Sequence, residues 1–239
     1  MLSPGSREPI EWKVLNRTED VRRLARKLTR MGEEGEVRAC YEAGPCGFAL
    51  KRQLEAAGSL VCEVVAPSLI PIRPGERVKT DRRDARKLAR MLRAGELTEV
   101  HPPSEPEEAV RDLMRCREDV REDLLRSRHR LAKLLLRRGR IYTGRAWTQV
   151  HREWLRSLVW EEAPDQVVCD DYLRAVELLE DRLRGLDAQV ELVAGQGPYC
   201  EAVGWLRCFH GIDTVTAMTV LAELHGLDRF QRTRPVIPS

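Results

Sequence analysis

Two aspartates three residues apart, Asp81 and Asp84, stand at the expected start of a helix and are surrounded by cationic side chains. This spacing places both carboxylates on one helical face, where they can point at the same object. Mg²⁺ is a suitable object, because it prefers a few carboxylates together with phosphate and water oxygens. The eight basic residues between Arg77 and Arg93 suit a nearby polyphosphate backbone. The alternative is structural, since aspartates in a first turn commonly cap a helix and complement its dipole.

A third carboxylate, Glu42, follows the short apolar run Val37–Tyr41, which predicts a strand that ends before the Gly44-Pro45 turn. In open α/β sheets, functional groups gather beyond the carboxyl ends of the strands. If the helix that starts near Asp81 packs against the same edge, three acids converge there. The alternative for Glu42 is an ordinary surface glutamate at the end of a strand.

The elements that must position these acids alternate along the first hundred residues. The patterns predict strands over 10–15, 37–41 and 61–66, and helices over 18–31, 48–57 and 81–94. This alternation indicates an α/β domain in which at least part of the sheet is parallel. Prolines at 102, 103 and 106 mark its boundary.

Beyond that boundary the sequence is typical of long helices. Residues 107–138 contain no Gly or Pro and have an amphipathic apolar repeat, and residues 167–192 repeat at a similar spacing. The two helices predict an antiparallel hairpin or a dimerising coiled coil; we favour the interaction role, with packing inside one chain as the alternative. Residues 126–140 carry seven basic residues and no acidic one, which indicates a surface for phosphates.

A new unit begins near Gly197. Its two short helices, joined by a tight turn at Gly211-Ile212-Asp213, resemble a helix–hairpin–helix. Backbone N–H groups at the start of the second helix, near Thr214, could bind a phosphate without reading sequence. Helical hairpins without any such role are common, and that alternative stays open.

Composition bounds the class of protein. The formal net charge is only +3 although 33% of the residues are charged, so the distribution of charge is more informative than its sum. Seven cysteines show no C-x-x-C pair and no histidine at zinc-ligand spacing, so we expect reduced and mostly buried thiols. No apolar run approaches the length of a membrane span, and a cytoplasmic protein is the default expectation.

Several motifs occur in an order that is similar to one known family. The chain resembles the DEDD-type transposases of the "one-ten" group of bacterial insertion sequences. The resemblance covers about residues 10 to 230 and is carried by Tyr41-Glu42-Ala43-Gly44-Pro45-x-Gly47, Val64-Val65-Ala66-Pro67-Ser68-Leu69-Ile70-Pro71, Lys79-Thr80-Asp81-x-x-Asp84-Ala85-x-x-Leu88-Ala89 and Gly211-Ile212-Asp213-x-x-Thr216-Ala217.

This resemblance implies a fold in three parts. Residues 1–103 would form an α/β ribonuclease-H/RuvC-like domain that lacks its first strand, and residues 104–195 a helical coiled-coil arm. Residues 196–239 would begin an all-α C-terminal domain with a helix–hairpin–helix. The function implied is DNA transposition, a site-specific recombination in which DNA strands are cleaved and exchanged with the help of Mg²⁺.

The resemblance also implies site residues and partners. Glu42, Asp81 and Asp84 would be three acids of an Asp-Glu-Asp-Asp tetrad that holds Mg²⁺ at the scissile phosphate. The implied partners are DNA, a structured guide RNA and further copies of the chain through the coiled coil. The residues expected to bind nucleic acid are Lys79, Arg82, Arg83, Arg86, Arg126, Arg130, Lys133, Arg137, Gly211 and Thr214.

Two departures from the family pattern shape the expectation. The tetrad's first aspartate belongs to a strand upstream of residues 10–15, and the family's nucleophilic serine lies beyond Arg229-Phe230; neither is recognisable here. We therefore expect a truncated copy that is inactive by itself. The alternatives are a non-catalytic protein that binds nucleic acid or dimerises, derived from a transposase, and a RuvC-like junction nuclease.

Overall fold

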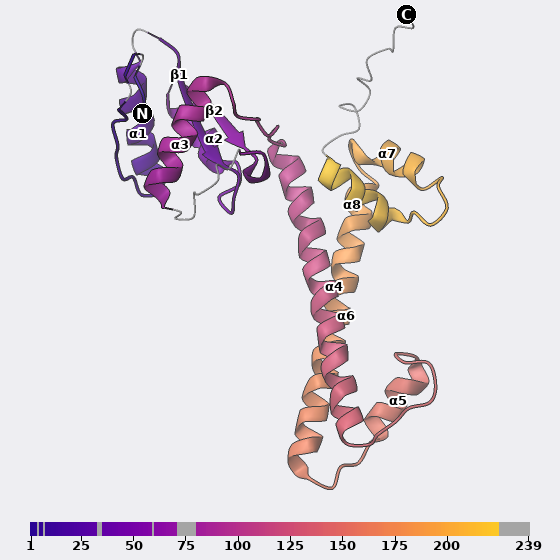
Figure 1. Ribbon diagram of the computed structural model, residues 1–239. Coiled ribbons are helices and arrows are strands. Elements are labelled where there is room, and N and C mark those ends of the chain that lie inside the picture. Colours follow the sequence, from indigo (N-terminus) through magenta and orange to yellow (C-terminus); the bar gives the residue numbers. More distant parts are fainter. Residues whose placement is uncertain (4, 7, 33–34, 59, 71–79, 225–239) are drawn as a thin grey trace, which may run out of the picture. The chain divides into compact units, whose positions relative to one another are not determined.

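The chain is described from a computed structural model that covers residues 1–3, 5–6, 8–32, 35–58, 60–70 and 80–224. It divides into two compact units, Met1–Pro102 and Pro103–Ser239, which are described separately. The described residues are mostly helical and contain one small sheet of two parallel strands (Figure 1). The prediction of three domains stays a prediction.

The sheet of the first unit pairs β1 (Val37–Glu42) with β2 (Leu60–Val65) in parallel. In this register the first residues of the two strands lie opposite each other. The last residues do so too, which places Glu42 opposite Val65. An isolated antiparallel bridge joins Val65 to Glu99. The predicted strands over 37–41 and 61–66 and their parallel pairing are confirmed.

The strand predicted over 10–15 was wrong, because these residues form no strand in the structure. Their apolar side chains remain exposed, with exposed fractions of 46% at Ile10 and 52% at Leu15. A short alternating run becomes a strand only if one of its faces is covered and its backbone finds a neighbouring strand. Neither condition is met here.

Helices α1 (Thr18–Met31) and α2 (Ala49–Ala57) cover one face of the sheet. Side chains at alternate positions of both strands join them in a buried core, which contains Val21, Ala25, Leu54, Leu60 and Cys62. A 3₁₀ turn, η1 (Pro67–Leu69), follows β2. Helix α3 (Asp81–Ala94) contacts β1 and ends at Gly95, whose φ of 70° only glycine adopts freely.

The second unit is built on two long helices that lie side by side, α4 (Glu105–Arg137) and α6 (Ala163–Ala194) (Figure 1). Ser104 starts α4 with a capping box, in which Glu107 bonds back to the backbone N–H of Ser104. Ion pairs between the helices set an antiparallel register: each pair further along α4 has its partner earlier on α6. These pairs are Arg117–Asp187, Arg128–Glu180 and Arg138–Asp165.

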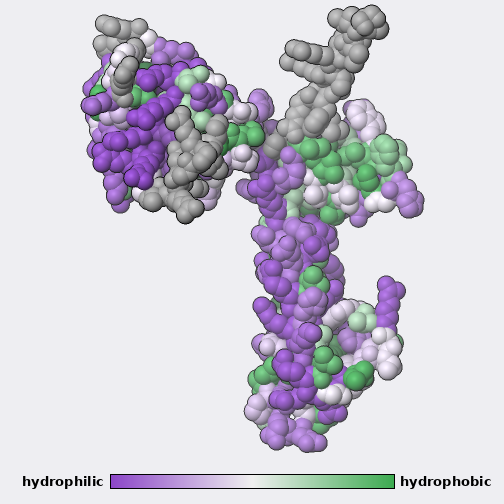
Figure 2. Space-filling model, viewed as in Figure 1, coloured by the Kyte–Doolittle hydropathy of each residue, from purple (hydrophilic) through white to green (hydrophobic). Residues whose placement is uncertain are grey.

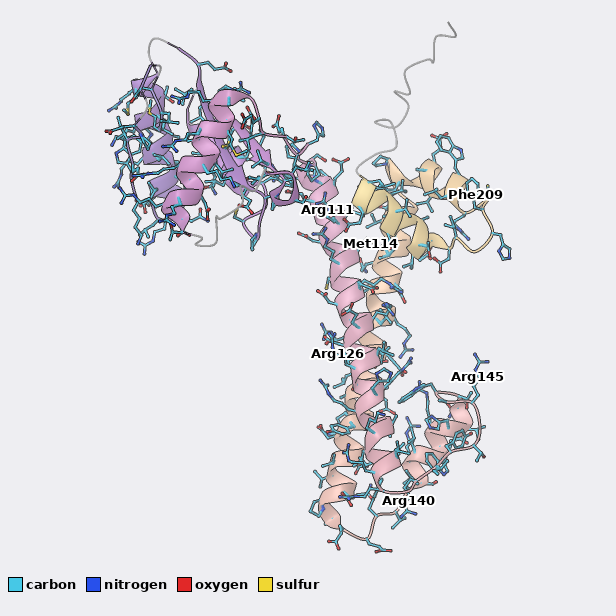
Figure 3. All side chains as sticks on the ribbon, in the orientation of Figure 1. Arg111, Met114, Arg126, Arg140, Arg145 and Phe209 are labelled. Carbon is cyan, nitrogen blue, oxygen red and sulfur yellow. The ribbon has the colours of Figure 1, made fainter. Side chains whose placement is uncertain are left out.

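Clusters of buried side chains lie at the two ends of this helix pair. At one end, the short α5 (Gln149–Ser157) and the surrounding loop pack against Leu131, Leu135 and Leu173. At the other end, α7 (Tyr199–Leu206) and α8 (Thr214–Leu224) pack against Met114 and Val190 (Figure 3). Helix α5 was missed in the sequence, where residues 139–164 were taken only as a connector.

Two expectations about composition can be compared with the structure. None of the described helices is long and apolar enough to cross a membrane. The expectation of mostly buried cysteines was wrong: all seven are free, but only Cys62 and Cys169 are buried, and Cys46, Cys116, Cys200 and Cys208 are exposed. The exposed cysteines lie at loop positions or on helix faces that no other element covers.

Candidate nucleic-acid and metal site

The three predicted acids all belong to the first unit. Glu42 is the last residue of β1 and is exposed. Asp81 is the first residue of α3 and is exposed, whereas Asp84, one turn later, is half-buried. Thr80 is the capping residue, since its hydroxyl accepts a hydrogen bond from the backbone N–H of Arg83. Neither aspartate is therefore needed as the cap, although both remain in the first turn, where they complement the helix dipole.

The acids do not form a ready-made metal site. Among the described residues there is no group of three or more His, Cys, Asp or Glu side chains that could hold a metal ion. Mg²⁺ needs near-octahedral oxygen ligands at about 2.1 Å, which scattered carboxylates do not supply. The three acids as placed here thus do not fit a preassembled Mg²⁺ site, and their assignment as metal ligands stays a prediction.

Some of the basic residues around the acids already bind a carboxylate of the same chain. Arg82 and Arg86 both donate through Nε to the Glu11 carboxylate. These two bonds lower the pKa of Glu11, and the bond from Arg86 has the larger effect. The carboxylate therefore stays ionised between the two guanidinium groups. Arg83 is exposed, and Lys79 lies outside the described residues. Sequence reasoning missed Glu11 because it precedes its partners by more than 70 residues.

A second basic surface lies on α4. We call Arg126, Arg130, Lys133 and Arg137 the α4 basic stripe; their spacing of four, three and four residues places them on one helical face. The buried residues Leu124, Leu131 and Leu135 lie on the other side of α4, and the last two share a buried cluster with Cys169 and Leu173 of α6. The stripe therefore points away from the helix pair, as Figure 3 shows for Arg126, and Figure 2 shows a hydrophilic surface along both helices.

The members of the stripe differ in their partners. Arg126 donates to Glu122 at 3.1 Å and to Asp123 at 2.7 Å. Arg130, Lys133 and Arg137 are exposed and have no ion-pair partner in the part of the chain that the structure describes. These three side chains are the cations of this stretch that are most available to an external anion.

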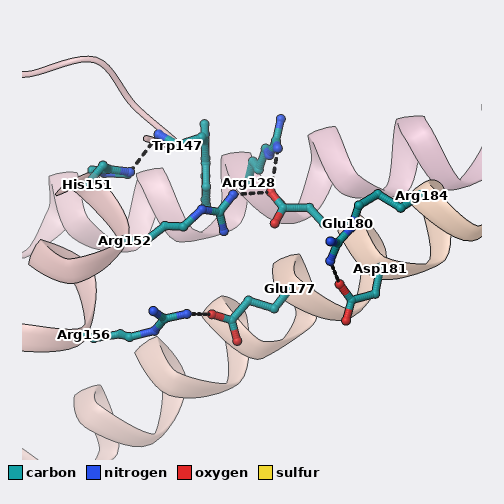
Figure 4. Close-up of polar contacts among 9 residues, drawn as sticks. All are labelled: Arg128, Trp147, His151, Arg152, Arg156, Glu177, Glu180, Asp181 and Arg184. Atoms are coloured by element: carbon teal, nitrogen blue, oxygen red, sulfur yellow. Dashed lines mark hydrogen bonds and ion pairs between the residues drawn. The ribbon is translucent and has the colours of Figure 1, made fainter. Parts of the chain in front are cut away.

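Other cations of residues 126–140 hold the fold together. Arg128 and Arg152 both donate to one oxygen of Glu180, each at 2.7 Å (Figure 4). The Trp147 ring lies under the Arg128 guanidinium at 4.9 Å, and the backbone N–H of Trp147 donates to His151 Nδ1 at 3.0 Å. Burial, together with the neighbouring Arg152 charge, lowers the pKa of His151. Sequence reasoning missed this network because its members lie up to 52 residues apart.

The phosphate site expected at the turn before α8 stays a prediction, and the structure shows which of its groups are already engaged. Gly211 has a φ of 85°, as a tight turn requires, but the Thr214 side chain is buried. The Asp213 carboxylate accepts a 2.7 Å hydrogen bond from the Thr216 N–H, and this bond lowers the pKa of Asp213. A carboxylate already occupies the start of this helix, so a phosphate there would meet like charge.

Comparison with known proteins places the chain among the transposases. The sequence profile of a transposase family, DEDD transposases of the IS110 type, matches residues 2–138 of the 239. The match includes all three predicted acids and the α4 basic stripe.

Two curated relatives are also transposases. The transposase for insertion sequence element IS1533 of Leptospira borgpetersenii is 37% identical over 237 residues, which are 98% of this chain and 68% of that protein. The putative transposase y4qE of Sinorhizobium fredii is 38% identical over 218 residues, 91% of this chain and 52% of that protein. The chain therefore belongs to the IS110 family of DEDD transposases, and it spans 68% and 52% of the lengths of these two relatives.

Removing the Glu11 charge should strengthen nucleic-acid binding by α3. In Glu11→Gln, Arg82 and Arg86 lose a competing anion and become available to phosphate, so we expect a roughly two- to fivefold lower Kd for single-stranded DNA at low salt. Fluorescence anisotropy measures this Kd. Glu8→Gln is the control, because it removes the same charge from the same segment without breaking a bond to either arginine. An equal effect of the two changes would contradict the masking role of Glu11.

Proposed function

We propose that the chain acts in DNA transposition, binds nucleic acid through the outward face of α4, and presents its strand-cleaving acids at β1 and α3. Membership of the family supports the class of reaction. The observation that carries the binding surface is the group of cations on α4, Arg130, Lys133 and Arg137, which lack ion-pair partners within the described ranges.

The geometry of this group suits a phosphate backbone. Arg130 and Arg137 are seven residues apart, which on a helix is a rise of about 10 Å. Phosphates recur every 3.4 Å of helix axis along one DNA strand, so a rise of about 10 Å covers three phosphate steps, within which three cations can contact the backbone. The buried side of α4 anchors the helix to α6, and the stripe is therefore held on a rigid support rather than on a loop.

For the acids we propose a role in the reaction but no individual step. Asp81 and Asp84, on adjacent turns of α3, and Glu42, at the end of β1, are the carboxylates that this chain contributes to the reaction. A divalent metal, when bound, would polarise the scissile phosphate. The acids as placed do not fit a preassembled metal site, so no further step is assigned to them.

The wider organisation is part of the same proposal. Residues 1–103 would be the ribonuclease-H/RuvC-like domain, 104–195 the coiled-coil arm, and 196–239 the start of a helix–hairpin–helix domain. The parallel strands with flanking helices support the first assignment, and the antiparallel α4–α6 pair supports the second. A structured guide RNA and further copies of the chain are the proposed partners besides DNA.

A second function is favoured by one specific observation. The absence of a three-ligand acidic group among the residues described would suit a non-catalytic protein that binds nucleic acid. Such a protein needs the α4 basic stripe but not Asp81 or Asp84. The two candidate functions thus share their binding surface and differ in their need for the acids.

The first prediction concerns the binding surface. Arg130→Gln removes a cation that has no ion-pair partner in the described chain. The negative slope of log K against log salt concentration should therefore become less steep by about 0.7 for single-stranded DNA. Arg126→Gln removes the same charge from the same stripe, but this arginine is already paired with Glu122 and Asp123. Its slope should stay close to that of the wild type. Equal slopes for both variants, or wild-type binding that does not depend on salt, would contradict the proposal.

The second prediction separates the two functions. Cleavage or joining, with Mg²⁺, of a DNA that carries the ends of its insertion sequence would support the transposition function and overturn the expectation that the chain is inactive by itself. Asp81→Asn should then abolish this activity while leaving DNA affinity within about twofold. Gel electrophoresis of labelled strands measures the activity, and anisotropy in EDTA measures the affinity. Salt-dependent binding without any cleavage would instead support the non-catalytic binding protein.

A further inference from the structure

A basic hollow lies in the first unit, away from the residues considered so far. It opens between α1 and α2 and has a volume of about 550 Å³. Three arginines, one amide and two small apolar residues line it, namely Arg22, Arg26, Arg52, Gln53, Ala56 and Ala57. No sequence motif pointed to it, because its residues come from two helices and have no characteristic spacing between them.

The packing of the two helices creates the hollow. On α1, Val21 and Ala25 are buried against the sheet, and each is followed by an arginine that lines the hollow beside this contact. On α2, Leu54 is buried in the same core. Because Ala56 and Ala57 carry only a methyl group, the space between the arginines stays open.

Two carboxylates of these helices are engaged with groups outside the hollow. Asp20 pairs with Arg23 at 3.9 Å, and Glu55 bonds to Lys51 and to the Cys62 N–H. Arg22 and Arg26 are exposed and have no ion-pair partner in the described ranges. Guanidinium groups gathered in this way repel one another, and an anion bound between them would relieve that repulsion.

The chemistry favours a phosphate group as the occupant. Guanidinium is a planar donor that bonds phosphate oxygens in pairs, and a volume of about 550 Å³ lies in the range of pockets for small molecules. Such a hollow accepts one phosphate with its sugar but not a double helix. We propose that the α1–α2 hollow binds a backbone phosphate of a single nucleic-acid strand. This inference rests on the proposed function, since it requires that the chain meets nucleic acid.

The test compares two pairs of charge changes, one on α1 and one at its start and first turns. Arg22→Gln/Arg26→Gln removes two cations of the hollow, and Arg17→Gln/Arg23→Gln removes two cations outside it. With a fluorescent thymidine octanucleotide, the first variant should make the negative slope of log K against log salt concentration less steep by about 1.4. This change corresponds to two phosphate contacts on a single strand. The control variant should keep the wild-type slope.

A third variant guards against a purely electrostatic explanation. Ala56→Leu fills the hollow without any change of charge and keeps a strong helix former on α2. It should weaken octanucleotide binding at least threefold, with circular dichroism and thermal unfolding matching the wild type. If Ala56→Leu folds and binds like the wild type, the hollow is not a binding site.

The source of the phosphate is decided by two further probes. NMR signals of the Arg22 and Arg26 Nε–H groups should shift with the octanucleotide, but not with an octanucleotide whose methylphosphonate backbone is uncharged. Shifts with inorganic pyrophosphate alone would make the hollow a site for free anions and overturn the strand assignment. If the wild type binds no octanucleotide, the proposed function fails as well; binding with equal slopes in both double variants overturns only this inference.

Discussion

The antiparallel packing of α4 against α6 is the constraint on which the second unit depends. Side chains such as Leu131 and Val176 are almost fully buried along this contact, and each buried side chain of this size contributes about 1.5–3 kcal/mol. The ion pairs between the helices add little energy but fix the register. Once the register is fixed, the clusters around α5 and around α7 and α8 find their partners, and the opposite face of α4 has to remain in water.

This constraint divides the arginines by role. Arg117, Arg128 and Arg138 pair with carboxylates on α6. Arg130 and Arg137, only one or two positions away along the chain, lie on the outward side and find no such carboxylate in the described structure. The same residue type thus stabilises the helix pair on one side and offers free positive charge on the other. The difference lies in the helical phase and not in the local sequence.

The sequence was sufficient where the signal is local and periodic. The parallel strands, their flanking helices and the two long helices could be predicted because apolar residues recur at the period of each element. The run over 10–15 failed because its alternation is short and its backbone pairs with no strand among the described residues. The pairing of Glu11 with Arg86, like that of Glu180 with Arg128, could not be predicted, because nothing local links residues that far apart.

The candidate site stays a prediction, although the structure places its residues. Glu42, Asp81 and Asp84 lie within the stretch that matches the family, and their role as metal ligands remains a prediction. Thr80 takes the capping role that had been the structural alternative for the two aspartates. At the α7–α8 turn the phosphate site also stays a prediction; there Thr214 is buried and Asp213 accepts a hydrogen bond from the Thr216 N–H.

The central claim is that the outward face of α4 binds nucleic acid. Photo-crosslinking tests it most directly, with benzoylphenylalanine introduced at His129, an exposed position beside the α4 basic stripe, or at Leu178, an exposed position on α6. The account predicts that labelled DNA crosslinks to the chain substituted at position 129 and that high salt removes this crosslink. Crosslinks of equal yield at both positions, or at position 178 alone, would contradict it.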